Sequence, residues 1–71
     1  MSEMPMPSKT TLSTREIDVL RLLIEGNKSR DIGRELGISE LTVQTHRRNM
    51  MRKLNVNLAG LIAYGIRHRI S

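Results

Sequence analysis

The residues best suited to chemistry lie in the segment ELTVQTHRRNMMRKL, residues 40 to 54, which is rich in Arg and Lys and has no acid after Glu40. At about 100° per residue in a helix, these positions separate into an apolar side with Val43, Met50 and Leu54 and an opposite side. We call the opposite side the basic face; it comprises Leu41, Thr45, Arg48 and Arg52, with Gln44 and Asn49 at its flanks. Its amide, hydroxyl and guanidinium groups are of the kinds that bind base edges or phosphates.

The positive charge of the chain is concentrated in its second half. The 71 residues carry a formal net charge of +5. Residues 1–40 contain six Lys/Arg and seven Asp/Glu, whereas residues 41–71 contain six Lys/Arg and no acid. This asymmetry predicts an anionic partner such as nucleic acid or a membrane surface, although a solvated basic surface is an alternative. Tyr64 is the single aromatic residue, which argues against stacking on single-stranded nucleic acid.

Catalysis and metal binding find little support in the sequence. There is no cysteine, so neither a disulfide nor a thiolate metal site is available. His46 and His68 are the two histidines, and without further ligands they do not make a zinc site. The basic half lacks paired carboxylates, and no nucleotide-binding glycine loop is present. We therefore expect no enzyme activity, no cofactor and no metal, and we expect His46 to be structural or to contact phosphate.

The chain divides into a tail and one small domain. Residues 1–10 are rich in Met, Pro and Ser without periodicity, which predicts a flexible tail or linker. Residues 11–71 are expected to form a single domain. Its longest apolar stretch, VLRLLI, contains Arg21 and is too short to span a membrane. No secretory signal pattern opens the chain, so the expected compartment is the cytoplasm.

Local signals predict that this domain contains four helices. The expected N-caps of the first three are Ser13, with Glu16 completing a capping box, then Asn27 or Ser29, then Ser39. Their expected ends are Gly26, Gly37 and Asn55, which tolerate positive φ. The fourth helix is predicted within residues 58–70 from the spacing of Leu58, Leu61, Ile62 and Ile66. Glu16 lies on the inner half of its helix, so we expect a basic partner for it from the third helix.

The second and third predicted helices are joined by only GIS, which is too short for an antiparallel return. Such a connection indicates a helix-turn-helix, here at about residues 29–54. The motif needs a small residue where the helices approach and a turn residue tolerant of positive φ, and Gly33 and Gly37 fit these needs. Apolar side chains must fill the angle between the helices; these are Ile32, Leu36, Ile38 and Val43. The sequence therefore predicts an all-α, four-helix domain containing a helix-turn-helix.

Three segments resemble a known family. LSTREIDVLRLLIEGN, LGISELTVQTHRRNMMRKL and the apolar fourth helix look like the LuxR/NarL/FixJ (GerE-type) DNA-binding domain, over about residues 11–70. The resemblance implies sequence-specific binding to double-stranded DNA, with the helix at about residues 40–54 in the major groove. It implies a homodimer through the fourth helix. Such domains usually follow a receiver or ligand-sensing domain in a longer bacterial transcription regulator, and RNA polymerase is a further possible partner.

The family's site residues carry over to matching positions. Its base contacts fall on Gln44, Thr45 and Arg48. Its DNA-backbone contacts fall on Lys28, Ser29, Arg30, Thr42, Arg47, Arg52 and Lys53. For Arg47, the wheel also allows a role in covering the core. The expected dimer contacts on the fourth helix are Leu58, Leu61, Ile62 and Gly65.

Two residues depart from the family's usual pattern. Gln44 stands where the family often has Lys, so the favoured base is expected to differ, with adenine in place of guanine. Gly33 stands where the family usually has Ala, which satisfies the packing but weakens the helix by roughly 0.5–1 kcal/mol. A different class of function stays open at this point, namely a protein-interaction module that docks an acidic partner on its basic face.

Overall fold

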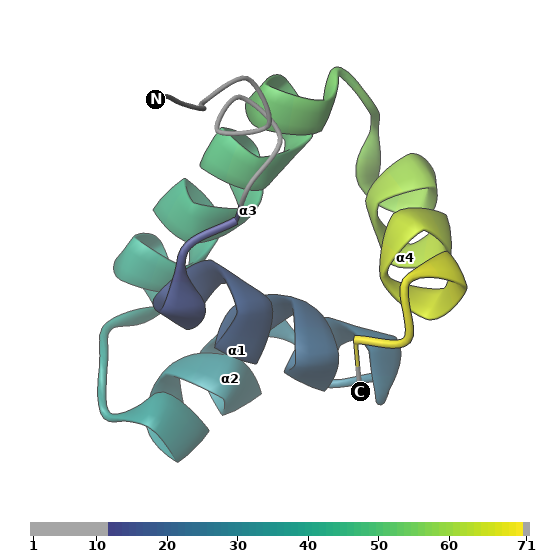
Figure 1. Ribbon diagram of the computed structural model, residues 1–71. Helices are drawn as coiled ribbons and strands as arrows, with labels where there is room; N and C mark the ends of the chain where they lie inside the picture. The colour runs from purple at the N-terminus through teal and green to yellow at the C-terminus, as the bar shows by residue number, and fades with distance from the viewer. Residues whose placement is uncertain (1–11, 71) are drawn as a thin grey trace, which may run out of the picture.

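The protein folds into four helices joined by short connections (Figure 1). A computed structural model describes residues 12–70, in which α1 spans Thr14–Ile24, α2 Ser29–Leu36, α3 Glu40–Leu54 and α4 Leu58–Arg67. α1 contacts all three other helices, and Figure 1 shows it in the middle of the domain, between α3 and α4. These helices confirm the all-α, four-helix prediction. The predicted tail at residues 1–10 lies outside the described residues.

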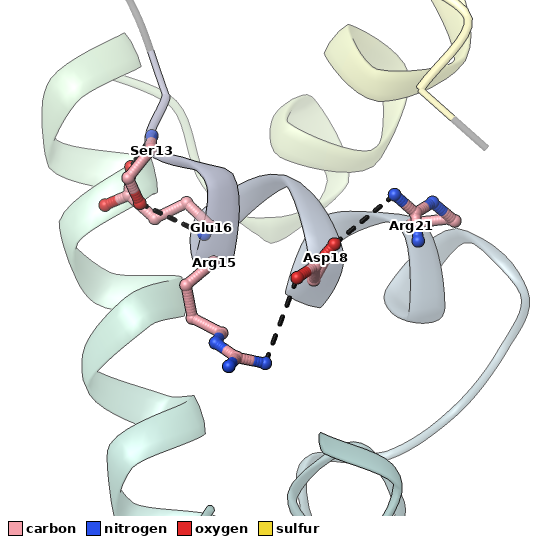
Figure 2. A network of polar contacts seen from close by, with 5 residues as sticks. All are labelled: Ser13, Arg15, Glu16, Asp18 and Arg21. Atoms are coloured by element: carbon pink, nitrogen blue, oxygen red, sulfur yellow. Dashed lines mark hydrogen bonds and ion pairs between the residues drawn. The ribbon is translucent and has the colours of Figure 1, made fainter.

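The helix ends follow the predicted local signals except at the start of α2. At the start of α1, Ser13 Oγ accepts a hydrogen bond from the Glu16 N–H at 3.1 Å, and Glu16 Oε1 accepts one from the Ser13 N–H at 2.8 Å (Figure 2). This reciprocal capping box satisfies two N–H groups that the helix itself leaves free. Gly37 ends α2 at φ 71°, and Asn55 ends α3 at φ 56°, both in the left-handed region.

The prediction for the start of α2 is wrong. Lys28 occupies the N-cap position, and its side chain makes no capping hydrogen bond. Asn27 is used elsewhere, because its Nδ2 donates to the carbonyl oxygen of Leu22 at 3.0 Å and so helps to close α1. Ser29 lies within the first turn of α2, and its hydroxyl faces α3. The α2 N-terminus is therefore held by contacts with α1 and α3, not by a local cap.

One hydrophobic core joins all four helices. Its buried apolar members are Leu12, Val19, Leu20, Leu23, Ile32, Val43, Met50 and Leu61. Six of these side chains are completely inaccessible to solvent, and burying each stabilises the fold by about 1.5–3 kcal/mol before entropy is counted. Val43 and Met50 come from the side of α3 predicted to be apolar, so packing fixes which side of α3 faces solvent.

The turn between α2 and α3 brings the two backbones into close contact at Gly33. The Ile38 N–H donates to the Gly33 carbonyl at 2.9 Å. A Cβ atom added to Gly33 would lie 2.6 Å from the Ile38 carbonyl oxygen and 3.3 Å from the Glu40 nitrogen. The first distance is too short for carbon and oxygen, and backbone atoms cannot rotate away. The small residue predicted at this point is thus required by the tight turn, which fixes α3 relative to α2.

Candidate nucleic-acid interface

The basic face of α3 is open to solvent. Gln44, Thr45 and Arg48, the three predicted base-contacting residues, are all exposed. Leu41 is exposed as well, at 68%. On the opposite side Val43 and Met50 are 0% exposed. The domain therefore presents amide, hydroxyl and guanidinium groups together along one rigid helix.

Short-range hydrogen bonds organise the N-terminal half of this face. Ser39 Oγ caps α3 by accepting from the Thr42 N–H at 3.0 Å, and it also pairs with Thr42 Oγ1 at 2.9 Å. Thr45 Oγ1 donates to the Leu41 carbonyl oxygen at 3.1 Å. Gln44 Nε2 reaches Glu40 Oε2 only at 3.5 Å, a weak contact. The Gln44 amide is consequently available for a stronger partner.

The guanidinium groups of Arg48 and Arg52 have no hydrogen bond or ion pair with any side chain or carbonyl of residues 12–70. Both residues are exposed. Each guanidinium offers several N–H donors in a planar fork that matches phosphate oxygens or the acceptor edge of guanine. The guanidinium groups of Arg48 and Arg52 are thus available to bind an anion.

Arg47 has a different environment. It is half-buried, and its Nη1 donates to Ser29 Oγ at 2.5 Å across the angle between α2 and α3. Its Nε is buried without a hydrogen-bond partner among the described residues. Ser29 is 6% exposed. Two predicted backbone-contacting side chains therefore bind each other and link α2 to α3. Sequence reasoning missed this bond because the two residues are 18 positions apart.

The remaining predicted contacts near α2 and the α3 N-terminus are accessible. Lys28 and Arg30 are exposed at the start of α2, and Thr42 is exposed in the first turn of α3. The side chains of Lys28 and Arg30 place positive charge beside the N-terminus of α2, where the helix dipole also favours anions. All three side chains are thus accessible to a partner in the structure.

Lys53 is bound to α1. Its Nζ lies 2.7 Å from Glu16 Oε1, and the Glu16 side chain is 5% exposed whereas that of Lys53 is 36% exposed. The prediction that Glu16 pairs with a basic residue of the third helix is confirmed. Any phosphate contact by Lys53 has to compete with this buried carboxylate.

The pKa of the Glu16 carboxyl lies below its ordinary value. Burial raises its pKa, but the hydrogen bonds from Lys53 and from the Ser13 N–H, together with the attraction of the ammonium charge, outweigh burial. The net effect holds the pKa of Glu16 below the ordinary 4.5. The carboxylate is therefore charged at neutral pH and ties the start of α1 to the end of α3.

The predicted dimer contacts of α4 fall on two different sides of the helix. Leu61 is 0% exposed, and a Cβ atom on Gly65 would lie 2.5 Å from Ile24 Cδ1 of α1. Because these two residues pack inside the domain, they are not available to a partner, and their assignment as dimer contacts is corrected. Leu58 is 36% exposed and Ile62 is half-buried; Ile66, four residues further on, is 61% exposed.

Two further features bear on the class of site. His46 is half-buried on α3, and residues 12–70 hold no group of three His, Asp or Glu side chains placed to bind a metal ion. In the same part of the chain, no helix is both long enough and apolar enough to cross a membrane.

Two packed helices, α2 and α3, joined by a three-residue turn, with a basic face exposed on the second, are typical of the class of helix-turn-helix DNA-binding domains. The chain belongs to the LuxR family of bacterial regulatory proteins, because the family model described as "Bacterial regulatory proteins, luxR family" matches residues 10–63. This membership makes it a transcription-regulator domain of a DNA-binding family, which is not a family of enzymes.

Several regulators are similar to this chain. The transcriptional regulatory protein MctR of Rhizobium johnstonii is 38% identical over 71 residues, which cover 99% of this chain and 33% of MctR. The spore germination protein GerE of Bacillus subtilis is 43% identical over 56 residues, 79% of this chain and 76% of GerE. The nitrate/nitrite response regulator protein NarP of Escherichia coli is 49% identical over 47 residues, 66% of this chain and 22% of NarP. No solved structure matches the chain.

The lengths of these relatives differ greatly from the length of this chain. It spans a third of MctR and less than a quarter of NarP, but about three quarters of GerE.

Proposed function

We propose that this chain binds double-stranded DNA in a sequence-specific manner, with α3 in the major groove. The observation that carries the proposal is the exposed basic face of α3, held opposite the buried Val43 and Met50. A helix that is fixed by its core side and carries free guanidinium and amide groups on its outer side suits the width and the chemistry of the major groove.

Electrostatic capture is the first step of the proposed mechanism. Arg52, Lys28 and Arg30 are exposed and positively charged, and they are assigned to DNA phosphates together with the exposed Thr42. Arg47 is assigned a positioning role through Ser29, with its positive charge close to the same phosphates. Lys53 contributes less, because its ammonium group is paired with Glu16.

Base discrimination follows from Gln44, Thr45 and Arg48. A glutamine amide forms two hydrogen bonds with adenine, and an arginine guanidinium forms two with guanine. The weak 3.5 Å contact between Gln44 and Glu40 is easily exchanged for a base. We therefore infer that the preferred site pairs an adenine with Gln44 and a guanine with Arg48.

We infer a homodimer through an outer stripe of α4. Leu58, Ile62 and Ile66 follow one another at four-residue spacing, and the first and last are exposed. Side chains at this spacing lie on the same side of a helix, so two copies could pack their stripes together. A two-fold dimer would read two half-sites about one helical turn of DNA apart.

The setting of the domain is proposed from its relatives. NarP is named as a nitrate/nitrite response regulator, and the matched region occupies only 22% of it. We infer that in a longer parent protein this domain would follow a receiver or sensory domain. Contact with RNA polymerase and action in the cytoplasm belong to the same proposal.

Fluorescence anisotropy with a random-sequence duplex at several salt concentrations tests the proposal. Arg52→Ala should weaken binding to all sequences and reduce the slope of log K against log salt by about one. Arg21→Ala is the matched control, because it removes the same charge from α1, where Arg21 pairs with Asp18 at 3.3 Å. Its slope should equal that of the wild type. Absence of duplex binding at low salt would instead favour the protein-interaction module.

A further inference from the structure

We propose that Leu41 is a further specificity-determining residue, which contacts the C5 methyl group of one thymine in the major groove. The inference rests on the proposed function, because it requires α3 to lie in that groove. Leu41 would join the predicted base-contacting residues Gln44, Thr45 and Arg48, but through an apolar contact in place of a hydrogen bond.

The exposure of Leu41 is the first observation. At 68% it exceeds the other exposed large apolar side chains, Ile66 at 61% and Leu58 at 36%. Ile66 and Leu58 lie on α4, whereas Leu41 stands on the basic face of α3. A leucine that is mostly exposed to water contributes little to the stability of the core. Its side chain gains hydrophobic free energy only when another molecule covers it.

The position of Leu41 is the second observation. It is the second residue of α3, and Thr45 and Arg48 follow it at the four- and seven-residue spacing of one helix face. In helix-turn-helix domains the N-terminal residues of the recognition helix approach the base edges. Leu41 therefore stands in line with the predicted base contacts, at the end of the helix that enters the groove.

The surroundings of Leu41 favour a small apolar partner. Its exposed neighbours on α3, Glu40, Thr42 and Gln44, are all polar. A single leucine among polar groups is not the broad apolar patch that binds another protein. The thymine methyl group is an isolated apolar group within a polar groove, and contact with it is a known way for proteins to distinguish thymine from cytosine.

The hydrogen bond of Thr45 supports the same contact. Thr45 Oγ1 donates its single proton to the Leu41 carbonyl oxygen at 3.1 Å. Thr45 consequently has no donor left for a base, and it offers its acceptor lone pairs and its methyl group. Leu41, one turn before Thr45, thus supplies the large apolar group of the basic face, close to the amide of Gln44.

Replacing thymine by deoxyuridine tests the contact without altering the protein, since the change removes only the methyl group. A preferred duplex is first selected with the wild-type chain, and each thymine in it is then replaced in turn. Wild-type affinity should fall about fourfold at one position, the factor expected for one buried methyl group. Leu41→Ala should bind the thymine and uridine duplexes equally well at that position, and Leu41→Met should restore the difference.

Gln44→Ala is the control variant. It should lose preference at a different base position and keep the full effect of the uridine replacement. The inference is overturned if the wild type tolerates uridine at every position, or if Leu41→Ala shows the same loss as the wild type. If the wild type binds no duplex in a salt-dependent manner, the proposed function fails and the inference fails with it.

Discussion

Replacing Lys53 by methionine tests how strongly the buried Glu16 carboxylate depends on its basic partner. Glu16 is 4% exposed and accepts hydrogen bonds from Lys53 Nζ at 2.7 Å and from the Ser13 N–H at 2.8 Å. Breaking a fully buried ion pair costs about 3–5 kcal/mol, whereas an exposed pair contributes about 1 kcal/mol or less. Because Lys53 is 36% exposed and the Ser13 bond remains, we expect a loss of about 1.5–3 kcal/mol at neutral pH.

Asp18→Asn is the matched control on the same helix. Figure 2 shows Asp18 between Arg15 at 3.8 Å and Arg21 at 3.3 Å, whose side chains are 45% and 43% exposed. Such exposed pairs contribute little, so the control should lose about 0.5 kcal/mol or less. Urea unfolding followed by circular dichroism measures both changes. A Lys53→Met variant that is no less stable than Asp18→Asn would refute the argument.

The contribution of the Glu16–Lys53 pair to the free energy of unfolding should change with pH in a definite direction. The folded pKa of Glu16 lies below 4.5, so the folded state binds this proton less readily than the unfolded state. The stabilisation that the charged Glu16 carboxylate provides is fully present above pH 4.5 and is lost as the pH falls through the pKa of Glu16 in the folded state. The stability difference between wild type and Lys53→Met should therefore shrink in acid. A difference that does not shrink anywhere on the acid side of pH 4.5 would contradict this assignment.

Three further substitutions follow from the packing and the site. Gly33→Ala should destabilise the fold by about 1–3 kcal/mol in urea unfolding, because the new Cβ meets the Ile38 carbonyl oxygen at 2.6 Å; an increase in stability would show that the turn relaxes freely. Ile66→Lys should leave binding to one half-site unchanged and weaken binding to a two-half-site duplex by about tenfold or more. If the variant and the wild type bound the two half-sites with equal cooperativity, the outer stripe of α4 would not be part of the dimer interface. Gln44→Lys should raise affinity for all duplexes and move the preference at one position from adenine to guanine in a selection assay; an unchanged preference would exclude Gln44 from base contact.

The helix ends and the helix-turn-helix were predictable because each depends on a few neighbouring residues. Ser13 caps α1 through a residue three positions away, and Gly37 and Asn55 end their helices by their own backbone conformations. The sidedness of α3 was predictable for a related reason, since Val43 and Met50 repeat at the helical period opposite the basic residues. Local rules sufficed at these positions, but they failed at the start of α2, where Lys28 occupies the N-cap without a capping hydrogen bond.

The other failures concern contacts between distant segments. The bond between Arg47 and Ser29 spans 18 residues and has no local signal. α4 is apolar on several sides, so spacing alone could not show that Leu61 is buried and Gly65 faces α1 while Ile66 faces solvent. Only the packing of α4 against α1 settles which apolar side is covered.

Sequence selection with wild type and Arg48→Ala tests whether the exposed guanidinium of Arg48 on α3 contacts a base, and not merely a phosphate. Arg48→Ala should lose preference at one base position, worth about 1–3 kcal/mol, while preferences at the other positions remain. An equal loss of affinity for all sequences would contradict base recognition by α3.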